Sequence, residues 1–87
     1  MTSKEFQSAI SKVIHAGLEY TAYPNNVLIN VTDVDGTIQS YYASTGTAMF
    51  RDGNDRFKTR THIERKMPLE RFIGICRGDE DTLVFFE

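Results

Sequence analysis

The stretch VLINVTDVDGTIQSYYA, residues 27–43, predicts two β-strands joined by a tight turn. Residues 27–32 and 37–43 alternate in polarity and are rich in β-branched and aromatic side chains, which favour strands. Between them stand Asp35 and Gly36, a pair that commonly supplies both positive-φ residues of a two-residue hairpin turn. We therefore expect an antiparallel hairpin with its turn at Asp35-Gly36.

Several other segments show the pattern of strands. Residues 18–23, 47–51 and 56–62 alternate in the same way, and turn-forming residues separate them from their neighbours. Residues 83–86 form a last apolar run, which predicts a strand that is covered on both faces or used against another chain.

Two segments have helical spacing instead. The apolar residues of segments 3–16 and 68–77 recur every three or four positions, and Thr2 and Glu5 form a capping box before the first of them. The predicted order is therefore α-β-β-β-β-(β)-α-β. We expect a single α+β domain over residues 1–87, an antiparallel β-meander with one helix at the N-terminus and another near the C-terminus.

The composition narrows the class of protein. The chain has 87 residues and one cysteine, Cys76, which forms no intrachain disulfide and builds no zinc site by itself. It has no basic start followed by an apolar run, and no apolar stretch of membrane-spanning length. We expect a cytoplasmic protein with no membrane contact, no metal and no cofactor.

The net charge of −2 hides an uneven distribution, because residues 51–77 hold eight Lys or Arg against four acids. Alternation puts the bases of residues 56–62 on one strand face, and a row of bases does not lie unpaired in a dry core. This face is expected to be solvated or to meet an acidic partner. Residues 78–87 hold four acids and no base. The candidate binding residues are Arg51, Arg56, Lys58, Arg60, His62, Arg65, Lys66, Asp79, Glu80 and Asp81.

Segregated charge in a small chain favours a non-enzymatic module that binds another macromolecule, with a protein as the preferred partner. The alternative is a nucleic-acid-binding domain that uses the basic strand 56–62, with Tyr41 and Tyr42 as stacking faces. A homodimer through residues 83–86 is a further expectation.

Residues 33–37, Asp-Val-Asp-Gly-Thr, resemble the first motif of the haloacid dehalogenase-like phosphatases. The resemblance implies a nucleophile at Asp33, a general acid/base at Asp35 and a Mg²⁺ ion beside both. That family needs a doubly wound parallel sheet, and this chain has no room for its long crossovers. Because a hairpin turn explains the same residues, we expect no catalytic residues here.

The motif order along most of the chain resembles small phage and prophage proteins of Gram-positive bacteria. The shared features are a helix ending in Ala-Gly, an Asp-Gly hairpin, Tyr-x-Ser-Thr-Gly-Thr-x-x-Phe at residues 42–50, a basic stretch, and Leu-Glu-x-Phe at residues 69–72. The resemblance implies a host- or phage-directed accessory protein that acts by binding another macromolecule.

Overall fold

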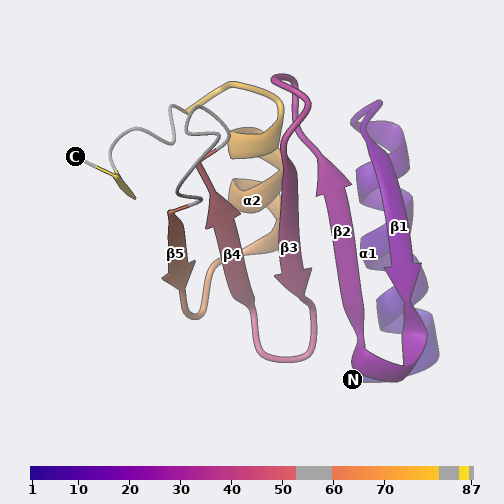
Figure 1. Ribbon diagram of the computed structural model, residues 1–87. Helices are drawn as coiled ribbons and strands as arrows, with labels where there is room; N and C mark the ends of the chain where they lie inside the picture. Colours follow the sequence, from indigo (N-terminus) through magenta and orange to yellow (C-terminus); the bar gives the residue numbers. More distant parts are fainter. Residues whose placement is uncertain (53–59, 81–84, 87) are drawn as a thin grey trace.

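The computed structural model describes residues 1–52, 60–80, 85 and 86 of the chain. These residues form an α+β fold, with a five-stranded antiparallel sheet whose strands lie side by side in chain order, β1-β2-β3-β4-β5 (Figure 1). The predicted fold class and the predicted order of helices and sheet strands are confirmed. The elements are α1 (Ser3–His15), β1 (Glu19–Tyr23), a 3₁₀ turn (Pro24–Asn26), β2 (Leu28–Thr32), β3 (Ile38–Tyr42), β4 (Thr47–Arg51), β5 (Thr61–Glu64) and α2 (Leu69–Cys76).

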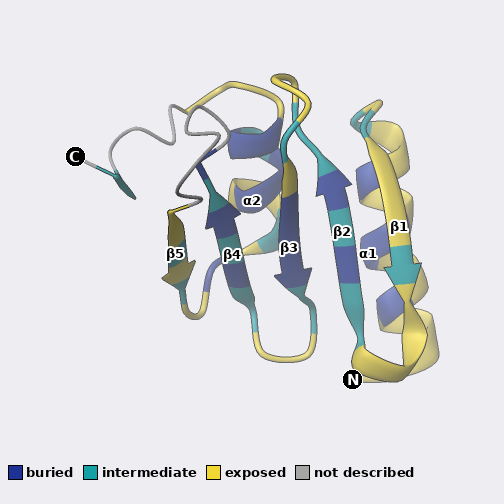
Figure 2. Cartoon of the chain, in the orientation of Figure 1, coloured by how far each residue is buried: buried dark blue, intermediate teal, exposed yellow. Residues whose placement is uncertain are grey.

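Both helices cover the same face of the sheet. In Figure 1, α1 lies behind β1 and β2, and α2 lies behind β3 and β4. The buried residues alternate along β2 and lie on the sheet-facing sides of the helices (Figure 2). Neither helix in the described part of the chain is long and apolar enough to cross a membrane. The core side chains are Phe6, Ala9, Ile10, Val13, Ile29, Val31, Tyr41, Ala48, Phe50, Met67, Phe72, Ile73, Ile75 and Cys76.

Local signals define both ends of α1. The Thr2 hydroxyl accepts a hydrogen bond from the Glu5 N–H at 3.2 Å, as the capping box predicts for its first half. At the other end Gly17 has a φ of 76°, and the N–H of Leu18 donates to the carbonyl of Val13 at 3.4 Å. This left-handed glycine with a returning hydrogen bond ends the helix and directs the chain into β1.

The turn between β2 and β3 differs from the predicted two-residue turn. Only Gly36 of this loop has a positive φ, 84°, and its N–H donates to the Asp33 carbonyl at 3.0 Å. The N–H of Asp33 in turn donates to the carbonyl of Thr37 at 2.8 Å. This is a three-residue loop, a type I turn followed by a left-handed glycine. The predicted two-residue turn is wrong because Asp33, which is favoured at the first position of a type I turn, starts the loop earlier.

A buried glutamine holds β3 and β4 together where their ladder ends. The recorded pairing of the two strands stops at Ser40 and Met49. Beyond it, the Gln39 Oε1 accepts the Arg51 N–H at 2.6 Å, and the Gln39 Nε2 donates to the Arg51 carbonyl at 3.2 Å. The Gln39 side chain therefore replaces backbone hydrogen bonds between the strands, which satisfies its amide inside the core.

The predicted strands after residue 52 need correction. β5 spans Thr61–Glu64 and Arg60 is not a strand residue, so the predicted strand 56–62 is wrong at residue 60, while its residues 56–59 lie outside the described part. Phe85 and Phe86 are not strand residues, so the predicted strand 83–86 is wrong for these two, while Leu83 and Val84 lie outside the described residues. The Phe85 ring stacks on Phe50 and on His62, with centroid distances of 5.1 and 4.6 Å, which extends the core toward β5.

Candidate functional site

The predicted basic residues that the structure describes lie in two groups. Arg51 and Arg60 lie near the start of β5, whereas Arg65 and Lys66 follow its end and are exposed in the turn before α2. Four strand residues separate the two groups, a distance of about 13 Å in an extended chain. The predicted site residues Arg56, Lys58 and Asp81 lie outside the described residues.

Arg51 and Arg60 are engaged within the chain. The Arg51 Nη1 donates to the Ile38 carbonyl at 2.8 Å and to the Ser40 hydroxyl at 3.0 Å. The Arg60 guanidinium pairs with the buried carboxylate of Asp52 and donates to the Phe86 carbonyl at 2.6 Å. Because a buried carboxylate needs a partner, Arg60 has a structural task in the fold.

His62, the last residue of the predicted basic face at residues 56–62, is partly exposed. This residue lies opposite Phe50 in the β4–β5 register, so its side chain is on the helix-covered side. Its Nε2 lies 3.0 Å from the Glu64 Oε1, and its ring stacks on Phe85.

The predicted acidic residues Asp79 and Glu80 follow α2. The Asp79 N–H donates to the Gly74 carbonyl at 2.8 Å, which helps to end the helix. Glu80 pairs with the Arg71 guanidinium at 3.5 Å. Both residues therefore have local partners on α2.

The carboxylate of Asp33 is occupied by the hairpin. Its Oδ1 accepts the N–H groups of Asp35 and Thr37, both at 2.9 Å, and its Oδ2 accepts the Gln39 amide at 3.0 Å. Asp35 is exposed at the loop tip. Within residues 1–52, 60–80, 85 and 86, no three His, Cys, Asp or Glu side chains come together as metal ligands.

Tyr41 does not offer the predicted stacking face. Its ring is buried against Phe72, and its hydroxyl donates to the Met67 carbonyl at 2.6 Å. Burial raises the pKa of Tyr41, and the nearby charge of Glu70 raises it further. Tyr42, the other predicted ring, points to the opposite side of the sheet and is half-buried.

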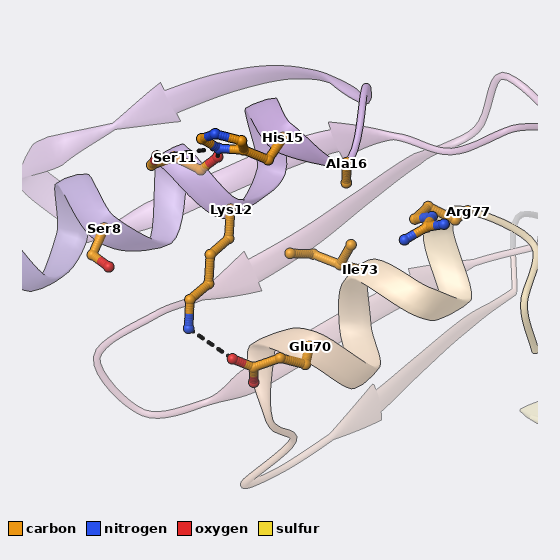
Figure 3. A pocket seen from close by; sticks show the side chains of 8 residues that line it. All are labelled: Ser8, Ser11, Lys12, His15, Ala16, Glu70, Ile73 and Arg77. Atoms are coloured by element: carbon orange, nitrogen blue, oxygen red, sulfur yellow. Dashed lines mark hydrogen bonds and ion pairs between the residues drawn. The ribbon is translucent and has the colours of Figure 1, made fainter.

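A groove between the two helices brings together residues that the sequence did not associate (Figure 3). Its volume is about 550 Å³. One polar flank of α1 supplies the residues of one wall at spacings of three and four, and α2 supplies the other wall in the same way. The lining residues are Ser8, Ser11, Lys12, His15, Ala16, Glu70, Ile73 and Arg77.

An ion pair joins the helices at one end of the groove. The Lys12 Nζ lies 2.7 Å from the Glu70 Oε1, and this hydrogen bond lowers the pKa of Glu70. Both side chains are more than half exposed, and exposed pairs of this kind contribute little to stability because solvent screens them. The pair can therefore open to admit an incoming charged group.

Arg77 lies at the other end, beside Ile73 and Ala16 (Figure 3). It is the C-cap residue of α2, and it forms no ion pair within the described part of the chain. Nearby on α1, the His15 Nδ1 lies 2.8 Å from the Ser11 carbonyl oxygen. A carbonyl only accepts, so Nδ1 carries the proton and the His15 Nε2 is left for another partner.

The groove thus combines a base at each end with an apolar floor. Lys12 and Arg77 outnumber the single acid Glu70, Ile73 is buried beneath them, and the hydroxyls of Ser8 and Ser11 line one wall. This arrangement suits a ligand that carries carboxylates and an apolar group. The spacing of the polar flank of α1 was visible in the sequence, but its position beside α2 was not.

The helix-free face of the sheet is less suited to binding. Its large apolar side chains Tyr23, Ile38 and Ile63 are exposed. A polar row crosses its centre, where the Ser40 hydroxyl donates to Asn30 at 2.7 Å and accepts from Arg51. The apolar surface on this side is therefore divided.

Comparisons with models of protein families, with curated proteins and with solved structures find no match for this chain.

Proposed function

We propose that this chain is a non-enzymatic interaction module that binds an acidic segment of another protein in the groove between α1 and α2. The observation that carries the proposal is the placement of Lys12 and Arg77 at opposite ends of an open groove with Ile73 at its floor. The groove volume of about 550 Å³ lies in the range of functional pockets. Docking of a segment between two helices is a common mode of peptide recognition.

The charges explain why the segment would be acidic. A carboxylate at Arg77 accepts two parallel hydrogen bonds from the guanidinium, a strong and directional contact. A second carboxylate competes with Glu70 for Lys12, and an apolar side chain between them packs on Ile73. The chain as a whole carries a net charge of −2, so the groove is a local basic site on an acidic protein.

We place this module in the cytoplasm, as the unpaired Cys76 favours. An accessory role for a phage or other mobile element rests on the motif resemblance at residues 42–50 and 69–72. Self-association through residues 83–86 stays a prediction.

The binding test uses a fluorescently labelled peptide in which Asp and Glu alternate with Leu. Arg77→Glu and Lys12→Glu are each expected to weaken binding by about tenfold or more, since each replaces an attraction by a repulsion. Lys4→Glu is the matched control, because it makes the same change of charge on an exposed part of α1 outside the groove. Fluorescence anisotropy measures the dissociation constant of each variant.

Two results would count against this function. An equal loss of affinity in Lys4→Glu would mean that only the overall charge matters. Tighter binding of single-stranded RNA or DNA than of the peptide, weakened by Arg65→Ala and Lys66→Ala, would favour the nucleic-acid alternative instead.

A further inference from the structure

β1 forms one edge of the sheet and has little of the usual edge protection. The strand order begins with β1, and within the described part of the chain no strand pairs with its outer side, while α1 lies behind it (Figure 1). The strand Glu19–Tyr23 contains no Lys and no Pro, and it pairs with β2 in continuous register without a bulge. Natural edge strands are generally protected by such features, because their free backbone groups pair readily with another strand.

The register shows which backbone groups are free. The Ala43 N–H donates to the Val27 carbonyl, and the Asp33 N–H donates to the Thr37 carbonyl. The backbone N–H and carbonyl groups of the odd-numbered residues of β2 therefore point toward β3. The backbone groups of the even-numbered residues of β2 consequently point toward β1, where they pair with Glu19, Thr21 and Tyr23. The N–H and carbonyl groups of Tyr20 and Ala22 are left on the open edge.

Apolar side chains border this edge on the helix side. Tyr20 lies opposite Val31, which is a core residue, so its ring is on the helix-covered face, yet it is 39% exposed. Ile14 lies on the flank of α1 away from the groove residues Lys12 and Ala16, and it is 53% exposed. The free backbone groups therefore adjoin apolar surface that a partner would bury.

We propose that a second copy of this chain pairs antiparallel with β1, with the two-fold axis at Thr21. Tyr20 then pairs with Ala22 of the other copy and the reverse, which gives about four backbone hydrogen bonds. Thr21 faces Thr21, a favourable cross-strand pair, and Glu19 faces Tyr23, so no like charges oppose each other. At each hydrogen-bonded pair the Tyr20 ring of one copy lies beside the Ala22 methyl group of the other. This self-complementarity favours a second copy of the chain over an unrelated strand.

The size of the contact indicates a reversible dimer. Five strand residues span about 17 Å, which places the interface among the small and transient ones. The surface differs from residues 83–86 and lies on the other flank of α1 from the groove, so the proposal stands apart from the proposed function.

The first test is sedimentation velocity of the full chain from about 10 µM to about 1 mM. The sedimentation coefficient is expected to rise from that of a monomer toward that of a dimer. Ala22→Pro is expected to remove the rise, because it deletes a free N–H while leaving the ladder to β2 intact, and edge strands tolerate such a proline. Ala22→Ser keeps the N–H and is the matched control. Circular dichroism checks that each variant is folded.

The second test uses the symmetry and does not depend on the proline variant. Thr21→Lys and Thr21→Glu each place like charges on the two-fold axis, so each variant alone is expected to dimerise less than the parent chain. An equimolar mixture of the two is expected to recover association at low salt. A chain that stays monomeric to about 1 mM overturns the proposal. So does a dimer that is unchanged in Ala22→Pro and in both Thr21 variants, or a monomer that pairs only with an unrelated extended peptide.

Discussion

Gln39 and Ile38 show how neighbouring residues can take unexpected sides of a sheet. Strand alternation places them on opposite faces, but it does not say which face is covered. In the structure Gln39 is 1% exposed and Ile38 is 50% exposed. The glutamine lies inside because its amide bridges β3 to β4 and also donates to Asp33. A contact between three separate segments explains the reversal, and hydrophobicity alone would predict the opposite.

Cys76 is expected to be inert in the folded chain. Burial, followed by the nearby charge of Asp33, raises the pKa of its thiol to about 12. The thiolate is the reactive form, so iodoacetamide at pH 8 is expected to label Cys76 only after unfolding. Rapid labelling of the native chain, detected by mass spectrometry, would contradict this.

The same pKa shift predicts a loss of stability in alkali. The pKa of Cys76 is higher in the folded state than in the unfolded state. The neutral thiol therefore makes its full contribution to the free energy of unfolding at any pH below the ordinary thiol pKa. It is lost as pH rises toward 12, by up to about 1.4 kcal/mol per pH unit. Urea unfolding between about pH 8 and pH 10 is expected to show a steeper decline in the parent chain than in Cys76→Ala. Parallel curves would mean that the thiol titrates normally in the fold.

At the scale of elements, the β2–β3 hairpin depends on Asp33 rather than on Asp35. Asp33→Ala is expected to lower the free energy of unfolding by about 2–3 kcal/mol, because it removes the acceptor of three hydrogen bonds. Asp35→Ala is the control and is expected to change it by less than about 0.5 kcal/mol, since Asp35 is exposed at the tip. Urea denaturation measures both.

The phosphatase resemblance makes a different prediction for the same hairpin. It requires hydrolysis of p-nitrophenyl phosphate with Mg²⁺ and loss of that activity in Asp33→Asn.

For the stability prediction, equal destabilisation by Asp33→Ala and Asp35→Ala would contradict the assignment of Asp33 as the residue that holds the turn.

The elements with strong local signals agree with the sequence prediction. The cap at Thr2 and the glycine at 17 bound α1, and β4 spans the predicted residues 47–51. The turn type was missed because Asp-Gly suits two kinds of hairpin, and the choice depends on the side-chain contacts of Asp33. At Phe85 an apolar ring packs on His62 outside the sheet, which hydrophobicity cannot distinguish from strand pairing.

At the scale of the whole molecule, the groove could not be predicted from the sequence. Its two walls are on α1 and α2, separated by the whole sheet in the chain, and only packing on the same sheet face brings them together. The basic stretch at residues 51–77 shows the reverse, because bases that are close in the sequence lie apart in the fold. Arg77 lines the groove, whereas Arg60 pairs with Asp52 next to the start of β5. Net charge along the chain therefore did not predict charge on the surface.

The groove and the β1 edge lie on opposite flanks of α1, so both surfaces can be used at once. A dimer through β1 would leave both grooves open and would present two copies of the proposed binding site. Two linked sites bind a bivalent partner more tightly than either site alone.

The groove between α1 and α2 is the proposed binding surface of this chain. The most direct measurement is a ¹H–¹⁵N correlation spectrum of the labelled chain, recorded while the acidic peptide is added. The largest shifts are expected at the groove residues, including Ser8, Lys12, Ile73 and Arg77, with little change at Leu28 or Met49 on the helix-free face. Shifts that concentrate on the helix-free face, or a spectrum that does not change, would contradict the claim.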